Sequence, residues 1–287
     1  MYAPEFDYYR AGSVAEAADL LKNHPGAKLL AGGHSLIPLL KLRLAAPPAL
    51  IDIGRIEDLR GVTVNGHTVR IGALTTHADL AASKTLQEQC PALSEAARQI
   101  GDPAVRNRGT IGGNVAHADP ASDLPTALMA VGATFTIAGA DGTRTVGAGD
   151  FFKGMMATAI GEHDLLVAIE VPSKAAGQGM AYVKFVHPAS RYAVIGVAAV
   201  VTLSGGACAA AQVALGGLVA KPTRATAVEQ VLAGQVLSAE TITRAATLLS
   251  QDLGRDTLGD LYASAEYRKA VAPVWVKRAL AAAAARA

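Results

Sequence analysis

Two short segments of the sequence carry paired glycines beside hydroxyl and amide side chains: Ala31-Gly32-Gly33-His34-Ser35 and Thr110-Ile111-Gly112-Gly113-Asn114. Successive glycines allow positive φ angles and let the backbone approach a ligand with no Cβ atom in between. In the first segment, the amides from Gly33 to Leu36 would converge on an anion. Ser35 is a suitable helix N-cap and Pro38 fits the first helical turn, so a helix dipole would add to the attraction. The predicted chemistry is the binding of a phosphate group.

The second segment repeats this arrangement and adds polar side chains. Its backbone amides would face a phosphate, with further donors from the amide of Asn114 and the hydroxyl of Thr110. Asp123 follows closely, and its carboxylate is a plausible acceptor for ribose hydroxyls. Asp123 is also readable as the N-cap of a helix through Leu128, and the two roles are compatible. Taken alone, each Gly-Gly pair is equally readable as an ordinary turn between a strand and a helix.

Neither segment matches the common nucleotide-binding loops. The dinucleotide-binding pattern is Gly-x-Gly-x-x-Gly with an acidic residue about 20 positions later, and the P-loop ends in Lys-Ser/Thr. Neither pattern occurs around the two glycine pairs. The sequence therefore disfavours both of those nucleotide folds.

Charge and metal-binding residues narrow the function further. The net charge is only +2, and no long basic stretch is present, which argues against a nucleic-acid partner. The two cysteines, Cys90 and Cys208, cannot supply the thiolates of an iron–sulfur cluster or a Cys-rich zinc site. The spacing of His34, His77 and His117 predicts no metal site either. If the protein moves electrons, its metal centres are expected on another chain.

Hydropathy favours a soluble protein although the mean hydropathy is +0.28. No window holds the roughly 20 uninterrupted apolar residues of a membrane-spanning helix. The apolar run at residues 194–203 is readable as a buried strand. The first seven residues show neither the charged nor the apolar region of a secretory signal. We therefore expect a cytoplasmic location, with any association with the inner face of the membrane made through partners.

The periodicity of apolar residues and the positions of glycine and proline divide the chain into three predicted units, residues 1–58, 59–172 and 173–287. The first is a βαβ-like unit. Its helix begins at Ser13 and ends by Gly26, and it is followed by a strand at 27–31, a helix at 35–44 and a strand at 49–53. The second opens with a hairpin in which Asn65-Gly66 would supply both positive φ angles of a type I′ turn.

Further elements follow from local signals. In the second unit we expect a helix after the capping box Thr76–Asp79, a helix at 91–100, and strands at 133–137 and 143–146 around Asp141-Gly142. In the third unit we expect strands at 180–186, 192–203 and 209–215, then helices at 223–232, 238–253 and 265–285. Pro273 should kink or interrupt the last helix, whose alanine-rich end would fray or be covered by a partner.

The two glycine segments, together with Asp119-Pro120-Ala121-Ser122-Asp123, resemble the flavin-binding subunits of molybdenum hydroxylases. This group includes the medium subunit of aerobic carbon monoxide dehydrogenase and the FAD domain of xanthine dehydrogenase. The resemblance extends from Phe6 to Arg278, and residues 31–38 look most similar to the carbon monoxide dehydrogenase type. It implies an α+β chain with an FAD-binding fold of the vanillyl-alcohol oxidase/p-cresol methylhydroxylase type, in two α/β subdomains. A C-terminal domain of antiparallel sheet and helices would follow.

The resemblance also implies a set of residues for non-covalently bound FAD. The diphosphate would lie on residues 31–36 and 110–114, and Asp123 would contact the adenosine part. Three other residues align near the rings: Leu165 beside the adenine, Lys184 reaching the flavin, and Tyr192 against the isoalloxazine. Ile100 would lie beside the cofactor. Both Ile100 and Tyr192 have an alternative interpretation, Ile100 as a core residue and Tyr192 as an ordinary aromatic residue of a strand. A positive group near the flavin N1/O2 edge would stabilise a reduced, anionic flavin.

The implied function is electron transfer. A large partner subunit with a molybdenum cofactor would oxidise the substrate, and a small partner subunit with [2Fe-2S] clusters would pass electrons to this FAD and onward to an external acceptor. On family analogy alone, the expected assembly is a heterotrimer that dimerises. No residue of this chain is assigned a catalytic role, and no metal is assigned to it.

Two alternative functions remain open from the sequence. One is a self-contained flavin oxidase or reductase of the same fold group, and the other is a scaffold that has lost the cofactor. Residues 186–191, Val-His-Pro-Ala-Ser-Arg, differ from the basic stretch of well-known carbon monoxide dehydrogenases. The substrate of the complex therefore stays open between carbon monoxide, an aldehyde and an N-heterocycle, and so does the electron acceptor.

Overall fold

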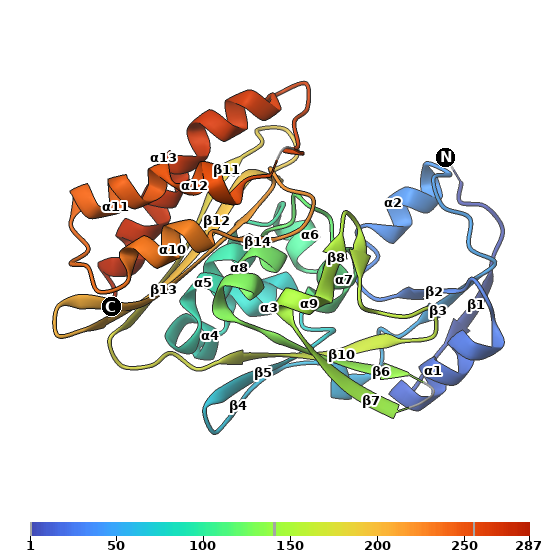
Figure 1. The fold of residues 1–287 in the computed structure, drawn as a ribbon. Helices are drawn as coiled ribbons and strands as arrows, with labels where there is room; N and C mark the ends of the chain where they lie inside the picture. The colour runs from blue at the N-terminus through green and yellow to red at the C-terminus, as the bar shows by residue number, and fades with distance from the viewer. Residues whose placement is uncertain (1, 140–141, 255) are drawn as a thin grey trace.

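The computed structural model describes residues 2–139, 142–254 and 256–287. In these residues the chain forms three larger sheets, which follow one another along the sequence, and one two-stranded sheet (Figure 1). The three larger sheets lie within residues 7–52, 62–172 and 178–224. The division of the chain at residues 58 and 172 stays an interpretation of where its units begin. No helix in the described part of the chain is both long and apolar enough to cross a membrane.

The first sheet is parallel, in the order β1 (Asp7–Arg10), β3 (Ala49–Asp52) and β2 (Lys28–Leu30). Two helices accompany it, α1 (Val14–Asn23) and α2 (Leu36–Lys41). The predicted start of α1 is confirmed, because the Ser13 hydroxyl accepts a hydrogen bond from the Glu16 amide at 3.1 Å. Strand β1 was not anticipated. Its four residues are mostly exposed and lack the alternating apolar pattern that marks a strand in a sequence.

The second sheet is antiparallel throughout, in the order β4 (Val62–Asn65), β5 (Thr68–Gly72), β10 (Leu165–Pro172), β6 (Thr134–Gly139) and β7 (Gly142–Gly147). The predicted hairpin is confirmed, but its predicted turn type is wrong. Asn65 still belongs to β4 and pairs with Thr68, so only Gly66 takes a positive φ, of 59°. Asp141, in the turn predicted between β6 and β7, lies outside the described residues.

Several short helices cover the second sheet and lead to the site. Helix α3 (His77–Ala82) begins at the predicted capping box, in which Thr76 and Asp79 bond reciprocally. The other elements of this region are η1 (Glu57–Leu59), α4 (Lys84–Gln89), α5 (Pro91–Arg98), α6 (Pro103–Arg106), α7 (Ile111–His117), α8 (Asp123–Val131), α9 (Ala148–Phe151), β8 (Phe152–Gly154) and β9 (Ala157–Thr158).

Two predictions for this region need correction. The Thr110–Asn114 segment is not a loop but the N-terminal turn of α7, with Thr110 as its N-cap. Ser122, not Asp123, occupies the N-cap position of α8, and Asp123 is the first residue of that helix. Helix α7 was not anticipated, because it is short and contains a glycine pair that usually marks a turn. The helix after Asp123 was anticipated, and only its first residue differs by one position.

The third sheet is antiparallel and consists of β11 (Gln178–Val186), β12 (Ala193–Ser204), β13 (Ala207–Gly216) and β14 (Thr223–Arg224). Its helices are α10 (Thr226–Leu232), α11 (Ala239–Thr247), α12 (Leu249–Asp252) and α13 (Ala265–Ala284). The predicted start of the first helix is wrong, because residues 223 and 224 pair with β13 instead. The predicted helix at 238–253 is two helices, α11 and α12.

The last helix also differs from expectation. Helix α13 continues through Pro273, so the predicted interruption is wrong, whereas the predicted kink stays a prediction. Ala272, Val276 and Ala279 on this helix are buried. Its end does not fray. The Arg286 guanidinium donates to the Glu95 carboxylate at 2.6 Å and to the Met180 carbonyl at 2.8 Å.

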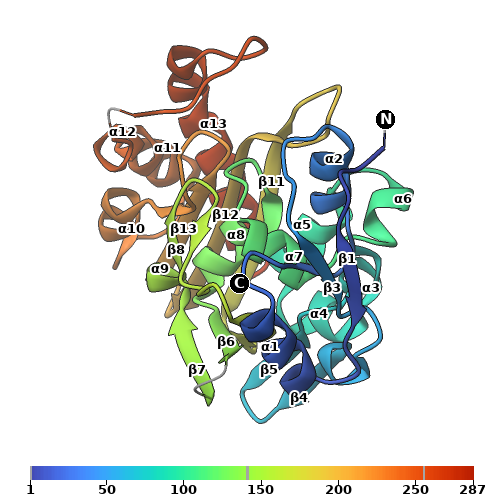
Figure 2. The ribbon, with the colours of Figure 1, turned by 90° about the vertical axis from the view of Figure 1, so that its right-hand side faces the viewer.

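Strand β12 explains how the third sheet joins the rest of the molecule. Its residues 193–201 are all buried, and alternate side chains enter two different cores. Val197 and Val201 pack with helices α10 to α13, whereas Ala198 and Val200 pack with the core around α5 and α8. Both views show this sheet between the C-terminal helices and the middle of the molecule (Figures 1 and 2). The apolar run that hydropathy marked is therefore a strand buried on both faces.

Candidate functional site

A cavity of about 1090 Å³ lies where the first unit, helix α7 and the β11–β12 loop meet. This volume is slightly above the usual range for small-molecule and cofactor sites, roughly 300–1,000 Å³. Most of the residues predicted from sequence line it: Ala31, Gly32, Gly33, His34, Ser35, Leu36, Ile100, Thr110, Gly112, Gly113, Asn114, Asp123 and Tyr192. Three predicted residues, Ile111, Leu165 and Lys184, are not among its lining residues.

The first glycine segment presents its backbone amides to this cavity. The amides from Gly32 to Leu36 donate to no residue that the structure describes. Gly33 has a φ of 73°, a conformation that favours glycine, and a Cβ atom there would lie 2.9 Å from Cγ1 of Ile37. Ser35 occupies the N-cap position of α2, but its hydroxyl makes no cap bond within the described chain. Successive unbonded amides are the donors that an anion site requires, so this segment stays the predicted position of the phosphate groups.

The amides of the second glycine segment are already in use. Those of Ile111 and Gly112 donate to the carbonyls of Thr75, at 3.0 Å, and Ala73, at 2.8 Å. The Gly113 amide donates to Oγ1 of Thr110 at 3.1 Å. The expectation that these amides face a phosphate is therefore wrong for the first two. Ile111 is fully buried in the core and does not reach the cavity.

The second segment instead supports the first. A Cβ atom on Gly32 would overlap the Arg108 carbonyl, so the first loop lies directly on the backbone that leads into α7. A Cβ atom on Gly112 would lie 2.6 Å from the Ala73 carbonyl oxygen. Glycine at 112 is thus required for close packing of α7, whereas glycine at 33 is required by the loop conformation.

Two buried polar atoms at the cavity have no partner among the described residues. They are Oδ1 of Asn114 and Nδ1 of His77. Burial, and to a smaller extent the charges of His34 and Arg106, lowers the pKa of His77 from 6.5 to about 4, so its imidazole is neutral at neutral pH. Buried polar atoms in native proteins nearly always have partners. A polar ligand in the cavity would supply them.

His77 is a residue that the sequence reasoning missed. It was weighed only as a metal ligand, and no group of three or more potential ligands is found within the described residues. The sequence nevertheless predicted that His77 begins a helix, because it directly follows the capping-box residue Thr76. The His77 amide donates to the Gly109 carbonyl at 2.9 Å, which places it where the two glycine segments meet.

Asp123 and Lys184 form a buried ion pair at one end of the cavity. Nζ of Lys184 lies 2.9 Å from Oδ2 of Asp123 and donates to the Gln99 carbonyl at 3.1 Å. The hydroxyl of Tyr182 donates to the other carboxylate oxygen at 2.6 Å. Burial raises the pKa of Asp123 and lowers that of Lys184, and the attraction between the two charges opposes both shifts. Both Asp123 oxygens are therefore engaged within the protein.

The cavity wall also includes Asp164 and Leu166, but not Leu165. Leu165 is fully buried in the core of the first unit, because alternate residues of a strand point to opposite faces. The Asp164 carboxylate accepts hydrogen bonds from Arg144 at 2.6 Å and from the Gly161 amide at 2.8 Å. The Arg144 bond is the main reason why the pKa of Asp164 lies below its usual value.

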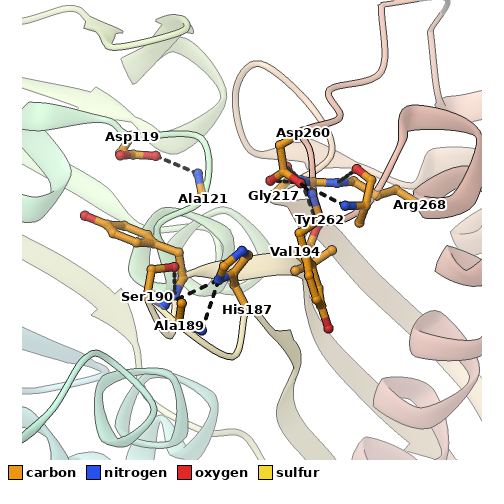
Figure 3. Close-up of polar contacts among 12 residues, drawn as sticks. Asp119, Ala121, His187, Ala189, Ser190, Val194, Gly217, Asp260, Tyr262 and Arg268 are labelled. Atoms are coloured by element: carbon orange, nitrogen blue, oxygen red, sulfur yellow. Dashed lines mark hydrogen bonds and ion pairs between the residues drawn. The ribbon is translucent and has the colours of Figure 1, made fainter.

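The third side of the cavity comes from the loop between β11 and β12. Ser190, Arg191 and Tyr192 all line the cavity, and Tyr192 is 43% exposed. Arg191 has a φ of 60°, which is uncommon for a residue other than glycine. Figure 3 shows the polar contacts that hold this loop. Sequence analysis identified Tyr192 but not its two neighbours, since nothing in their spacing marks them.

These features fit FAD. The unbonded amides from Gly32 to Leu36 suit its diphosphate, and the unpartnered Asn114 and His77 atoms suit its polar groups. The family described as "FAD binding domain in molybdopterin dehydrogenase" matches residues 4–174, and "CO dehydrogenase flavoprotein C-terminal domain" matches residues 180–283. The chain belongs to the FAD-binding subunits of the molybdopterin dehydrogenases, and it is an oxidoreductase subunit with FAD as its cofactor.

Individual relatives support this assignment over the whole chain. The carbon monoxide dehydrogenase medium chain of Hydrogenophaga pseudoflava is 43% identical, with 100% of this chain and 99% of the relative covered. The glyceraldehyde dehydrogenase medium chain of Sulfolobus acidocaldarius is 39% identical, with 97% and 98% covered. A solved structure of carbon monoxide dehydrogenase from Hydrogenophaga pseudoflava matches with a TM-score of 0.95 and 44% identity, covering 100% of this chain and 99% of that one. The resemblance inferred from the glycine segments, and the fold that it implied, are confirmed.

Proposed function

We propose that this chain is the electron-transfer subunit of a carbon monoxide dehydrogenase-like complex. In this proposal a large subunit with a molybdenum cofactor oxidises the substrate, and a small subunit with [2Fe-2S] clusters delivers the electrons to this chain. Bound FAD supplies the redox chemistry, and the chain binds, orients and shields it. The observation that carries the proposal is the cavity, with its run of unbonded amides between Gly32 and Leu36.

The polar groups of the cavity suggest how FAD is oriented. We place the diphosphate at residues 32–36, with Thr110, Gly113 and Asn114 beside it and His77 at the junction. Asp123 and Lys184 are bonded to each other, so they cannot serve opposite ends of an extended cofactor. We therefore propose that Asp123 lies at the flavin end of the cofactor and not at the adenosine end. Lys184 would then lie on the side of Asp123 away from the cofactor, and Ile100 and Tyr192 would lie near the flavin. Residues around Asp164 and Leu166 then face the adenosine.

Carbon monoxide is our first choice of substrate, and a small aldehyde is the second. The second rests on the glyceraldehyde dehydrogenase medium chain, whose identity to this chain is only slightly lower than that of the carbon monoxide dehydrogenase relative. Because the substrate would be oxidised on the large partner subunit, both substrates require the same FAD binding and electron transfer from this chain. Assays of the purified complex with each substrate and an artificial electron acceptor distinguish them.

The decisive experiment is purification of the native complex from cells that express all its subunits. We expect the visible absorbance bands of oxidised flavin, bleaching of these bands on addition of substrate, and two further subunits carrying molybdenum and iron. The isolated chain reconstituted with FAD should oxidise no organic substrate. Turnover by the isolated chain would instead establish a self-contained flavoenzyme. Failure of both preparations to retain FAD would establish a scaffold without cofactor.

We also propose that the complex is a dimer of heterotrimers located in the cytoplasm. The oligomeric state rests on family analogy, and the location rests on the sequence expectation. Light scattering of the purified complex measures its mass, and a mass of one heterotrimer would contradict the first part. Recovery of the activity in the extracellular or periplasmic fraction would contradict the second.

A further inference from the structure

The loop between β11 and β12 spans residues 187–192 and brings three residues to the cavity wall. It is closed at its base, where the His187 amide donates to the Tyr192 carbonyl at 2.8 Å. The Arg191 amide donates back to the His187 carbonyl, also at 2.8 Å. His187 is therefore bonded through its backbone to Arg191 and Tyr192, two of the three loop residues that line the cavity.

Two side chains make the remaining bonds of this loop. Nδ1 of His187 accepts hydrogen bonds from the amides of Ala189, at 3.2 Å, and Ser190, at 3.3 Å (Figure 3). The Ser190 hydroxyl accepts one from the Tyr192 amide at 3.3 Å. Between them lies Arg191, whose left-handed conformation persists only where its surroundings determine it. The His187 imidazole fixes the turn that precedes Arg191, and it is the one of the two side chains that accepts two amides.

The other side of the His187 ring rests on the C-terminal part of the chain. It lies against the ring of Tyr262, with centroids 4.7 Å apart and the rings inclined at 60°. The amides of Tyr262 and Ala263 both donate to Oδ1 of Asp260 at 2.9 Å. Asp260 is paired in turn with Arg268 of α13. The support of the loop is thus a compact turn fixed to the longest helix (Figure 3).

Arg268 connects this turn to the strands that leave the cavity. It is 4% exposed and donates to the carbonyls of Val194, at 3.3 Å, and Gly217, at 2.8 Å. The outgoing end of the loop is held separately, since the Ala193 amide donates to the Ala121 carbonyl at 3.1 Å. The contact between His187 and Tyr262 therefore connects this part of the loop to the turn that is fixed to α13.

We propose that His187 is a positioning residue for the cofactor. By accepting two amide hydrogen bonds at Nδ1 while resting on Tyr262, it holds Arg191 and Tyr192 in place against the flavin end of the cavity. The proposal rests on FAD occupying that cavity. It assigns His187 no contact with the reacting atoms.

The proposal depends on the acceptor at Nδ1 and not on the ring alone. Two amide donors meet this one atom, so a side chain without an acceptor leaves both amides of the turn without a partner from His187.

The test uses two variants in the complete complex. His187→Asn retains an acceptor that can reach the amides two and three residues later, as in an Asx turn, but lacks the aromatic ring. His187→Phe retains a ring against Tyr262 but lacks the acceptor. We expect the Kd for FAD to rise about tenfold for the Phe variant, from the loss of two neutral hydrogen bonds, and to stay within about twofold for the Asn variant.

Rescue by the Asn variant separates positioning from general stability, because it restores the acceptor without the ring. Thermal unfolding of each cofactor-free chain checks that it is folded. A Phe variant that binds FAD like the native protein would refute the proposal, as would an Asn variant that binds FAD as weakly as the Phe variant. If the Phe variant fails to fold, the Asn variant decides, since a Kd about tenfold higher there would refute the proposal. A native complex without any FAD would refute the assigned function instead.

Discussion

Gly112 and Gly113 are neighbours in the sequence, but they serve different purposes. A Cβ atom at 112 would collide with the backbone of residue 73, whereas one at 113 would lie 3.0 Å from the Thr110 hydroxyl and 3.9 Å from the Cβ atom of Ala31. We predict that Gly113→Ala leaves the chain folded and raises the Kd for FAD about tenfold, because the added methyl group occupies cofactor space and disturbs Thr110. Flavin fluorescence during titration measures this.

Gly112→Ala is the matched comparison. It should lower the free energy of unfolding by about 2–4 kcal/mol, because helix α7 must move away from Ala73. Urea unfolding of the cofactor-free chain gives this value. Equal losses of stability in the two variants would contradict the division of roles between these glycines.

His77 makes the folded chain sensitive to acid. Its pKa is about 4 in the folded chain against 6.5 for an unperturbed histidine, so the unfolded chain binds the proton first as the pH falls. The resulting loss begins near pH 6.5, is complete near pH 4, and amounts to about 3 kcal/mol. We predict that His77→Gln removes this part of the pH dependence. Urea unfolding of both cofactor-free proteins at pH 7 and pH 4.5 measures it, and parallel losses in the two would contradict the role of His77.

At the scale of elements, the C-terminal helix packs against β11 without room for a side chain. A Cβ atom on Gly179 would overlap the Ala283 carbonyl. We predict that Gly179→Ala lowers the free energy of unfolding by about 2–4 kcal/mol. Gly149, in α9, is the control, because no described atom beyond its own neighbours lies within 4 Å of its Cβ position. Gly149→Ala should be neutral or stabilising by up to about 1 kcal/mol, and thermal unfolding of both variants compares them.

Helices and strands that carry a signal in their own residues, such as a helix cap or an apolar run, could be predicted from the sequence. Those that form only because they pair with a distant segment could not. The helix after Ser13, the capping box at Thr76 and the buried strand β12 are each marked by residues of their own. Strand β14 is two residues long and exists only because it pairs with β13, so its sequence reads as the start of a helix. The turn of the Asn65-Gly66 hairpin was misjudged because Asn65 stays in the ladder with Thr68.

The candidate site shows the same limit. Glycine pairs revealed both segments that meet at the cavity, but sequence alone did not show that the carbonyls of Ala73 and Thr75 occupy the amides of the second one. The ion pair between Asp123 and Lys184 could not be predicted from the sequence either, because 61 residues separate them. Spacing therefore located the site, whereas the assignment of individual donors required the fold.

At the scale of the whole molecule, the cavity has walls from all three regions of the chain, including Gly33, Asn114 and Tyr192. A cofactor there should stabilise the three regions together. We predict that FAD at 100 times its Kd raises the free energy of unfolding by about 2.7 kcal/mol and increases Tm by several degrees in one transition. Calorimetry across a series of FAD concentrations measures this. A Tm that does not change with FAD would contradict a cofactor site shared by the three regions.

The closed hydrogen bonding of the second glycine segment has an evolutionary consequence. Because Gly112 is required by the packing of α7 against Ala73, selection for a stable fold retains it even in a descendant that no longer uses flavin. Gly32 and Gly33 are constrained in the same way, by the Arg108 carbonyl and by the loop conformation. Ser35 has no such constraint, because its hydroxyl makes no cap bond within the described chain, so this position is free to diverge once the cofactor is lost. Among homologues, the glycines of both segments should thus record ancestry, and the residue at position 35 should distinguish flavoproteins from descendants that have lost the cofactor.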